Sequence, residues 1–342
     1  MPEQFAPGFA LGRAPAGLAV FRSPRWLPGG NLQTIWAARL SRPVQGAAPV
    51  FRRERWDTPD GDFIDVDFAF EGPDEAGRRR PLLVLFHGLE GSSTGHYSLA
   101  MADEARRRGW TYAVPHFRGC SGELNRGPRA YHSGDFQEIG WILARLRARE
   151  PAPLAGVVGI SLGGNALMCW AAEAGESAAQ VTRAVASVCS PLDLAAAGEA
   201  IDRGFNRQVY ARMFLATMKP KALAKLAQHP GLFDAERLRA ARTLREFDDV
   251  FTGPLHGFAG TDDYWCRASA KPRLHSIRIP ALALNARNDP FIPAQSLPRA
   301  GEVGQVELWQ PDHGGHVGFA HGALPGHLRA MPQAVLDWMA AQ

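Results

Sequence analysis

One serine, Ser161, lies between two glycines in the segment 159–163 (GISLG). An apolar, strand-like run over 154–160 precedes it, and an apolar, helix-like segment over 162–174 follows. A strand-to-helix turn of this kind is so tight that side chains at the glycine positions would collide with neighbouring elements. The turn also exposes the hydroxyl beside helix amides, which favour developing negative charge. The pattern predicts a nucleophilic serine for acyl transfer, with an ordinary glycine-rich turn as the alternative.

A nucleophilic serine needs a base to take its proton and a carboxylate to fix the tautomer of that base. When the serine lies on such a turn, the carboxylate precedes the histidine in the chain. Asp289 follows a strand-like run over 281–284 and lies in a loop that contains Pro290 and Pro293. We therefore predict Asp289 as the orienting carboxylate, with a turn-capping aspartate as the alternative.

The loop over 310–319 follows a second strand-like run, 306–309, and offers two histidines. We predict His316 as the base, because Gly314 and Gly315 let the backbone bring its ring inward and the apolar residues after it anchor the loop. His313 is expected at the surface or beside the catalytic groups. A metal-binding role for His313 is disfavoured, because the sequence has no HExxH motif or comparable ligand cluster.

The oxyanion that forms during acyl transfer needs preorganised donors, usually two backbone amides. The amide of Leu162, directly after the nucleophile, is predicted as one donor. The second is predicted in the segment 87–91 (HGLEG), at Leu89, with Glu90 as the less favoured choice. The alternative for this segment is a plain turn at the end of a strand.

Strand-like and helix-like segments alternate four times between residues 81 and 190, which predicts a mostly parallel sheet flanked by helices. Two further strand-like runs, 50–56 and 63–70, are separated by a hairpin turn. In the second run Asp65 and Asp67 alternate with apolar residues, which predicts a strand exposed to solvent on one face.

We predict an irregular N-terminal arm over 1–48 and a single α/β domain over 49–342. Within that domain, residues from about 191 to 275 are aromatic-rich, look helical and contain no strong strand, so we expect an inserted helical cap, or lid.

The bulk composition, with 46% hydrophobic and 21% charged residues, is that of an ordinary folded protein. A net charge of +4 and an arginine run at 78–80 without interleaved aromatic residues argue against nucleic acid as a partner. Four widely spaced cysteines fit neither a disulfide framework nor a zinc site, which favours reduced thiols in a cytoplasmic protein. The sequence offers no signal peptide and no apolar stretch long enough for a transmembrane helix.

Seven segments together resemble the YheT-like, or AB-hydrolase-4, branch of the α/β-hydrolases, which includes ABHD1/ABHD3-type enzymes. They are GNLQT (30–34), HGLEG (87–91), RGCSGE (118–123), YHSG (131–134), GISLGGN (159–165), NDP (288–290) and HGGHVGF (313–319). The resemblance implies the α/β-hydrolase fold, carboxylesterase-like or lipase-like activity on acyl esters, no cofactor, and His316 rather than His313. Eukaryotic members tend to carry an N-terminal membrane anchor, which is not evident here, so only transient contact with a membrane surface is expected.

Taken together, the sequence predicts a serine esterase that forms an acyl-enzyme on a small-molecule or lipid-like ester, with a hydrophobic acyl chain bound beneath the lid. An acyltransferase with the same three residues and a non-catalytic binding module remain the alternatives. Cys120 is a second, less favoured nucleophile. Arg118, Tyr131 and His132 are expected to shape the pocket wall, with Arg118 bonding to backbone carbonyls. The oligomeric state is not predicted.

Overall fold

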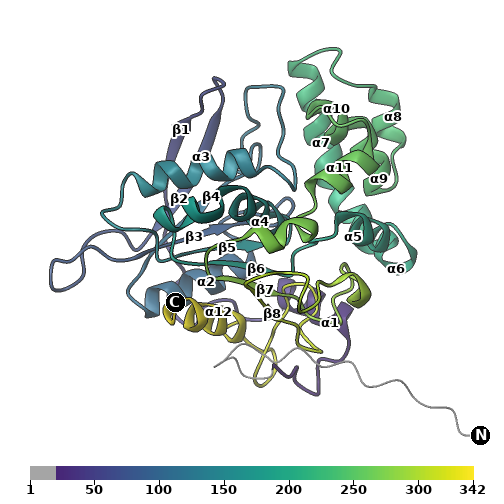
Figure 1. Cartoon of the computed structure of the whole chain (residues 1–342). Coiled ribbons are helices and arrows are strands. Elements are labelled where there is room, and N and C mark those ends of the chain that lie inside the picture. The colour runs from purple at the N-terminus through teal and green to yellow at the C-terminus, as the bar shows by residue number, and fades with distance from the viewer. Residues whose placement is uncertain (1–20) are drawn as a thin grey trace, which may run out of the picture.

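The computed structural model describes residues 21–342 and contains one eight-stranded sheet covered by helices on both faces (Figure 1). The strand order is β1-β2-β4-β3-β5-β6-β7-β8, in which β1–β2 and β2–β4 pair antiparallel and all other neighbours pair parallel. The strands are β1 (Arg52–Asp57), β2 (Phe63–Ala69), β3 (Leu82–Phe86), β4 (Thr111–Pro115), β5 (Gly156–Ile160), β6 (Val185–Val188), β7 (Ala281–Leu284) and β8 (Val306–Trp309). This is the predicted α/β-hydrolase architecture.

The sheet separates two hydrophobic cores, because the parallel strands carry apolar residues on both faces. One core is completed by α3 (Phe136–Arg147) and α4 (Leu162–Ala174), and the other by α2 (His96–Arg107) and α12 (Ala330–Ala340). The carboxyl ends of β5, β7 and β8 lie along one edge of the sheet, so the loops that follow them can meet there.

The prediction that β2 is exposed on one face is wrong, because all seven of its residues are buried. Asp65 and Asp67 do alternate with apolar residues, but Arg55 and Arg53 of the neighbouring β1 pair with them at 2.8 and 2.7 Å. The loop that follows β4 covers the same face, since His116 Nε2 lies 2.8 Å from Asp67. The pattern identified a polar face correctly, but ion pairs rather than water cover it.

Between the end of β6 and residue 275, helices are the only regular secondary structure. They stack above the carboxyl edge of the sheet (Figure 1). They are α5 (Leu194–Ile201), α6 (Gly204–Asn206), α7 (Arg212–Gln228), α8 (Ala235–Ala240), α9 (Leu244–Phe247), α10 (Gly253–Leu255) and α11 (Thr261–Ala268), with π-helical turns over Arg207–Ala211 and Asp248–Thr252. We call this segment the cap. It has its own small apolar core, which includes Leu215, Leu238 and Phe247.

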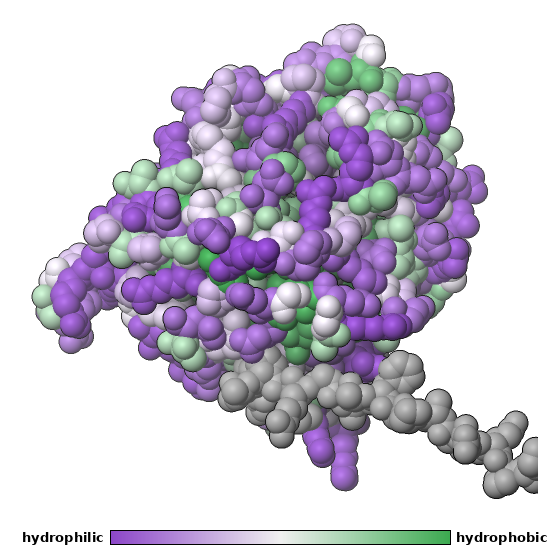
Figure 2. All heavy atoms as spheres, viewed as in Figure 1, coloured by the Kyte–Doolittle hydropathy of each residue, from purple (hydrophilic) through white to green (hydrophobic). Residues whose placement is uncertain are grey.

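The first 20 residues of the expected N-terminal arm lie outside the described residues. The rest of the arm is not wholly irregular, because residues Gly30–Arg39 form helix α1. In Figure 2 the visible face of the molecule is mostly hydrophilic, with hydrophobic residues in small separate groups. Within residues 21–342, no helix has both the length and the hydropathy needed to cross a bilayer.

Candidate active site

Ser161 lies on the sharp turn between β5 and α4, with φ 51° and ψ −120°. A non-glycine residue at positive φ is strained by about 1–3 kcal/mol and persists only where its surroundings enforce it. Close packing of the turn against β3 and α4 enforces it here, and the flanking glycines make that packing possible. A Cβ on Gly159 would lie 2.6 Å from the carbonyl oxygen of Gly163, and a Cβ on Gly163 would lie 2.7 Å from that of Phe86. The turn can therefore form only with glycine at both positions, as the sequence pattern predicted.

The structure brings Asp289 and His316 to this serine. Asp289 Oδ2 lies 2.8 Å from His316 Nδ1, and His316 Nε2 lies 3.0 Å from Ser161 Oγ. The Asp289 side chain is fully buried and the His316 side chain is 12% exposed. These contacts suit a neutral imidazole that donates from Nδ1 to the carboxylate and accepts the serine proton at Nε2. Such an arrangement can activate a hydroxyl for attack on a carbonyl.

His313 is exposed, whereas the neighbouring glycines and the residues after His316 are buried. The ring of His316 packs on Phe291, with 4.2 Å between ring centroids. Of the two histidines in this loop, only His316 contacts Ser161 and Asp289.

The turn after β3 leaves one amide free beside the serine. The amides of Gly88 and Glu90 donate to the hydroxyls of Tyr97 and Tyr131, each at 3.0 Å, and that of Gly91 donates to the Gly88 carbonyl. Among the described residues, the amides of Leu89 and Leu162 have no acceptor, and both residues line the same cavity as Ser161. These two amides can donate hydrogen bonds to an oxyanion, whereas the amide of Glu90, the other choice, already donates to Tyr131.

His87 holds this turn, a role that the sequence analysis did not predict. Burial lowers the pKa of His87 to about 3, so the ring is neutral. Its Nδ1 donates to the Gly88 carbonyl at 2.8 Å, and its Nε2 accepts from the Phe117 amide at 3.1 Å. A neutral ring with the proton on Nδ1 satisfies both contacts and links two loops beside Leu89. The only sequence signal for this role was that His87 directly follows a run of buried, strand-like residues.

Three more polar residues escaped prediction: Gln33, Thr34 and Asn288. Each bonds to the backbone of the loop that carries His316. Gln33 and Thr34 lie within α1, where the sequence predicted an irregular arm. The motifs GNLQT (30–34) and NDP (288–290) marked these three positions by resemblance but gave them no role.

A cavity of about 1110 Å³, including its open mouth, lies between the sheet edge and the cap, with Ser161 on its wall. Its lining is mainly apolar and comes mostly from the cap, including Ile201, Phe214, Met218, Leu244, Phe251 and Trp265. Lys221 of α7 pairs with Glu90 at 2.8 Å, and both side chains line the cavity. A cavity with this mainly apolar lining suits a small molecule with a substantial apolar part.

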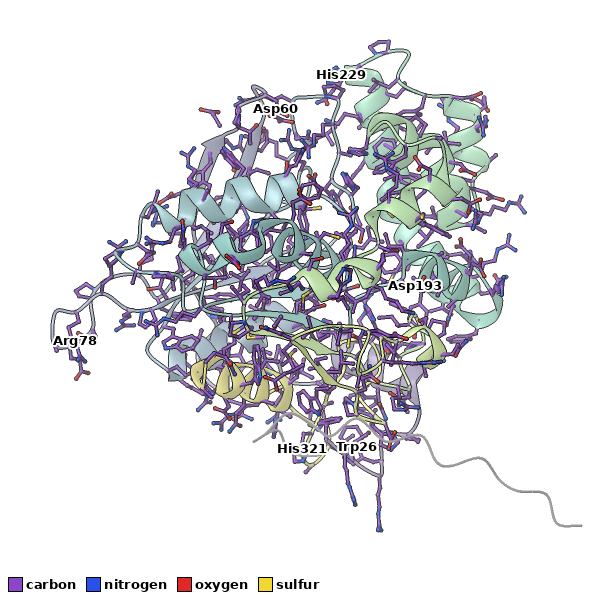
Figure 3. The ribbon with its side chains drawn as sticks, viewed as in Figure 1. Trp26, Asp60, Arg78, Asp193, His229 and His321 are labelled. Atoms are coloured by element: carbon purple, nitrogen blue, oxygen red, sulfur yellow. The ribbon has the colours of Figure 1, made fainter. Side chains whose placement is uncertain are left out.

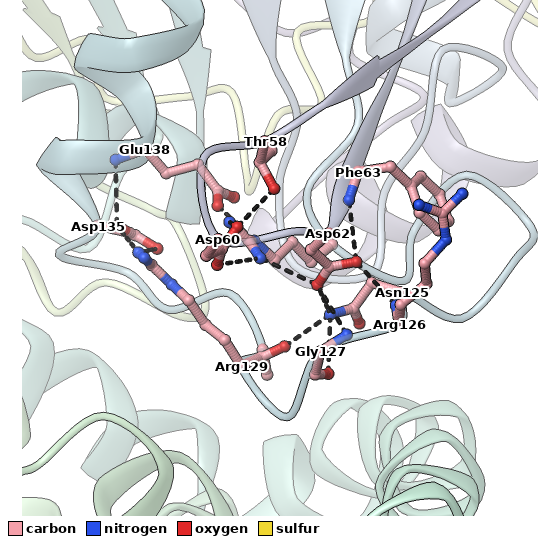
Figure 4. Close-up of polar contacts among 12 residues, drawn as sticks. Thr58, Asp60, Asp62, Phe63, Asn125, Arg126, Gly127, Arg129, Asp135 and Glu138 are labelled. Carbon is pink, nitrogen blue, oxygen red and sulfur yellow. Dashed lines mark hydrogen bonds and ion pairs between the residues drawn. The ribbon is translucent and has the colours of Figure 1, made fainter.

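Arg118 anchors the loop that forms another wall of the cavity, through contacts that differ from the prediction. Instead of backbone carbonyls, it binds the carboxylates of Asp60, Asp62 and Glu138, at 2.8, 2.9 and 2.5 Å. Asn125 also bonds to Asp62, at 2.6 Å (Figure 4). A charged network is needed here because a buried guanidinium must be paired.

The other predictions for this loop concern Tyr131, His132 and Cys120. Tyr131 and His132 line the cavity as expected. Burial raises the pKa of Cys120 to about 12, so its thiol stays protonated at neutral pH. A protonated thiol is a poor nucleophile, which argues against the alternative nucleophile.

The carboxyl group of Asp248 lies among the apolar side chains that line the cavity. Its Oδ2 accepts from Trp265 Nε1 at 2.9 Å, and burial raises its pKa from 3.8 to about 7. The folded protein therefore holds this proton more tightly than the unfolded chain does. The stabilisation that protonation provides is lost as pH rises through about 7.

Asp248→Asn keeps an acceptor for Trp265 but cannot ionise. We expect its free energy of unfolding, relative to wild type, to increase by about 3 kcal/mol between pH 4.5 and pH 8.5 in urea titrations. Thr217→Ala, at an exposed residue of α7 that does not titrate, should show no such trend. A difference between Asp248→Asn and wild type that stays constant with pH would contradict the assignment.

Comparisons with known proteins agree with this fold. The pattern of the family described as "alpha/beta hydrolase fold" matches residues 81–323. The chain is 39% identical over 324 residues to "Putative esterase YheT" of Escherichia coli K12, covering 94% of this chain and 93% of that protein. It is 29% identical over 321 residues to mouse "Phospholipase ABHD3", covering 90% and 76%. The solved Pyrococcus furiosus esterase Pf2001 has a similar fold, with a TM-score of 0.50, 14% identity and coverage of 88% and 95%.

Proposed function

Because this chain belongs to the α/β-hydrolase family, and within it to the YheT-like branch, we propose that it is a serine esterase that cleaves carboxylic esters through Ser161, His316 and Asp289. The observation that carries the proposal is the unbroken hydrogen-bond chain from Asp289 through His316 to Ser161 Oγ, with distances of 2.8 and 3.0 Å. Ser161, Asp289 and His316 follow β5, β7 and β8, whose carboxyl ends lie along one edge of the sheet, and Ser161 lines the apolar cavity.

The reaction has two steps. Ser161 Oγ attacks the ester carbonyl while His316 Nε2 takes its proton, and the oxyanion accepts hydrogen bonds from the amides of Leu89 and Leu162. His316 then returns the proton to the departing alcohol oxygen, which leaves an ester between the acyl group and Ser161. In the second step His316 deprotonates a water molecule, which attacks this acyl-enzyme. His316 then returns the proton to Ser161 Oγ as the bond to the acyl group breaks, which releases the carboxylic acid and the free serine.

A fluorophosphonate probe tests the nucleophile directly. We expect the probe to add one phosphonyl group to wild-type protein, at Ser161 by peptide mass spectrometry, and to leave Ser161→Ala unlabelled. Because alanine removes only the attacking oxygen, the variant should keep the thermal midpoint of wild type within a few degrees. A folded wild-type protein that is not labelled would refute the esterase proposal, as would labelling that persists at another residue of Ser161→Ala.

The mainly apolar cavity supports a hydrophobic acyl chain as the group that lies beneath the cap. We therefore expect kcat/KM to rise from short to medium-length acyl esters, since each buried methylene contributes up to about 0.8 kcal/mol. Ala222 of α7 is buried and lines this cavity, whereas Ala216 of the same helix is exposed. Ala222→Leu should lower kcat/KM selectively for the longer chains, and the matched Ala216→Leu should not. Cleavage of short, water-soluble esters alone would contradict this substrate class.

Water is the proposed acceptor of the acyl group. Product analysis distinguishes this hydrolysis from transfer of the acyl group to another acceptor. With excess alcohol or thiol added, a hydrolase should still release mainly free acid. A predominant new ester or thioester would instead identify an acyltransferase with the same nucleophile.

A further inference from the structure

Thr34 fixes the backbone of the histidine. Its Oγ1 accepts from the His316 amide at 2.8 Å and donates to the Gly30 carbonyl at 2.7 Å. The side chain is 8% exposed, so water does not readily replace either contact. One hydroxyl therefore links the first turn of α1 to the residue whose ring contacts Ser161.

Gln33 joins the histidine loop to the acid loop. It is 2% exposed, and its Oε1 accepts from the Gly314 amide at 2.9 Å and from Asn288 Nδ2 at 3.0 Å. Asn288, the neighbour of Asp289, closes the connection by accepting from the Gly315 amide at 3.0 Å. The two side-chain amides together therefore hold Asp289 and His316 in register.

The backbones of α1 and the two loops approach so closely that side chains are excluded between them. A Cβ on Gly30 would collide with the Asn288 carbonyl, and one on Gly315 would lie 2.7 Å from the Gly30 carbonyl. The helix itself is anchored to the chain near His321, because Trp26 Nε1 and Trp36 Nε1 donate to the carbonyls of Gly322 and Pro325 at 3.1 and 2.7 Å. Figure 3 shows Trp26 and His321 together at the bottom of the molecule in that view.

We propose that Gln33 and Thr34 are positioning residues, which hold His316 and Asp289 in the geometry that lets His316 take the serine proton. This inference rests on the proposed esterase function. Neither residue touches Ser161, so each acts only through the two loops. Movement of about 1 Å in a reacting group can cost about a hundredfold in rate, and removing either acceptor frees the loop to move on that scale.

The test compares two variants of one residue. Thr34→Val keeps the shape of threonine but removes the acceptor, whereas Thr34→Ser keeps the hydroxyl. We expect Thr34→Val to lower kcat about 10- to 100-fold with KM within about twofold of wild type. The second-order rate of fluorophosphonate labelling at Ser161 should fall with kcat, and Thr34→Ser should stay within about threefold of wild type.

Trp26→Phe controls for a general loss of stability, because it removes only the bond to Gly322, leaves the Trp36 anchor of α1 in place and touches neither loop. It should lower the thermal midpoint while leaving kcat near that of wild type. If Thr34→Val does not fold, Gln33→Met carries the test, since it removes the acceptor shared by Gly314 and Asn288.

The proposal is overturned if folded Thr34→Val or Gln33→Met keeps kcat within threefold of wild type, or if Thr34→Ser loses as much rate as Thr34→Val. Failure of the esterase proposal itself looks different, since wild-type protein would then lack labelling at Ser161.

Discussion

His316→Ala is expected to lower kcat for ester hydrolysis by about 10⁴- to 10⁶-fold, with a small change in KM. The imidazole Nε2 is the only base in contact with Ser161 Oγ among the described residues, so its loss leaves the serine proton without an acceptor. The amides of Leu89 and Leu162 remain in place and should keep a residual rate above the uncatalysed reaction. Steady-state kinetics on an ester with a chromogenic leaving group measures both parameters.

His313→Ala is the matched control, because this histidine lies three residues earlier in the same loop and is exposed. Its kcat should stay within about twofold of wild type. If the two alanine variants had similar kinetics, or if His313→Ala alone lost activity, the assignment of the base to His316 would be wrong.

The sequence could predict the three residues of the proposed site because each one directly follows, or lies in the loop after, a strand of the sheet. Ser161, Asp289 and His316 each follow an apolar strand-like run, and parallel strands end at one edge of their sheet. The tight turn at Ser161 was also predictable, since glycines at 159 and 163 leave out the side chains that would collide there. Local sequence patterns therefore predict both the nucleophile and the positions of its partners.

The residues that hold this site together were not predictable, because their roles depend on contacts between distant segments. Gln33 bonds to Gly314, and no periodicity in an arm rich in proline and glycine reports such a contact. The prediction that one face of β2 is exposed failed for a similar reason. An alternating strand looks the same whether water or Arg53 and Arg55 lie opposite its aspartates.

The cap presents an intermediate case. Its helical character was evident from the absence of strand-like runs, but the position of one titratable group within it was not. Asp248 lies in a sequence of mixed charged and aromatic residues, where a solvent-exposed carboxylate would be the ordinary expectation. Only the packing of the π-helical turn Asp248–Thr252 against α11 places it beside Trp265 in the cavity.

Asp289→Asn is expected to lower kcat by about 10³- to 10⁴-fold while leaving the fold intact. The asparagine can still accept from the Phe291 amide, which now donates to Asp289 Oδ1 at 2.8 Å. Its NH₂ group, however, would donate to His316 Nδ1 and move the imidazole proton to Nε2, where the ring can no longer accept from Ser161. Asp312→Asn, at an exposed aspartate four residues before His316, should retain full activity.

The double variant Asp289→Asn/His316→Ala separates the role of the carboxylate from a general effect on the site. Because Asp289 contacts His316 and not Ser161, its substitution should cost nothing further once the imidazole is gone. Equal kcat values for the double variant and His316→Ala, with both midpoints near that of wild type, are the expected result. A further loss of tenfold or more in the double variant would mean that Asp289 acts on the reaction independently of His316, and the hydrogen-bond chain would not describe how the serine is activated.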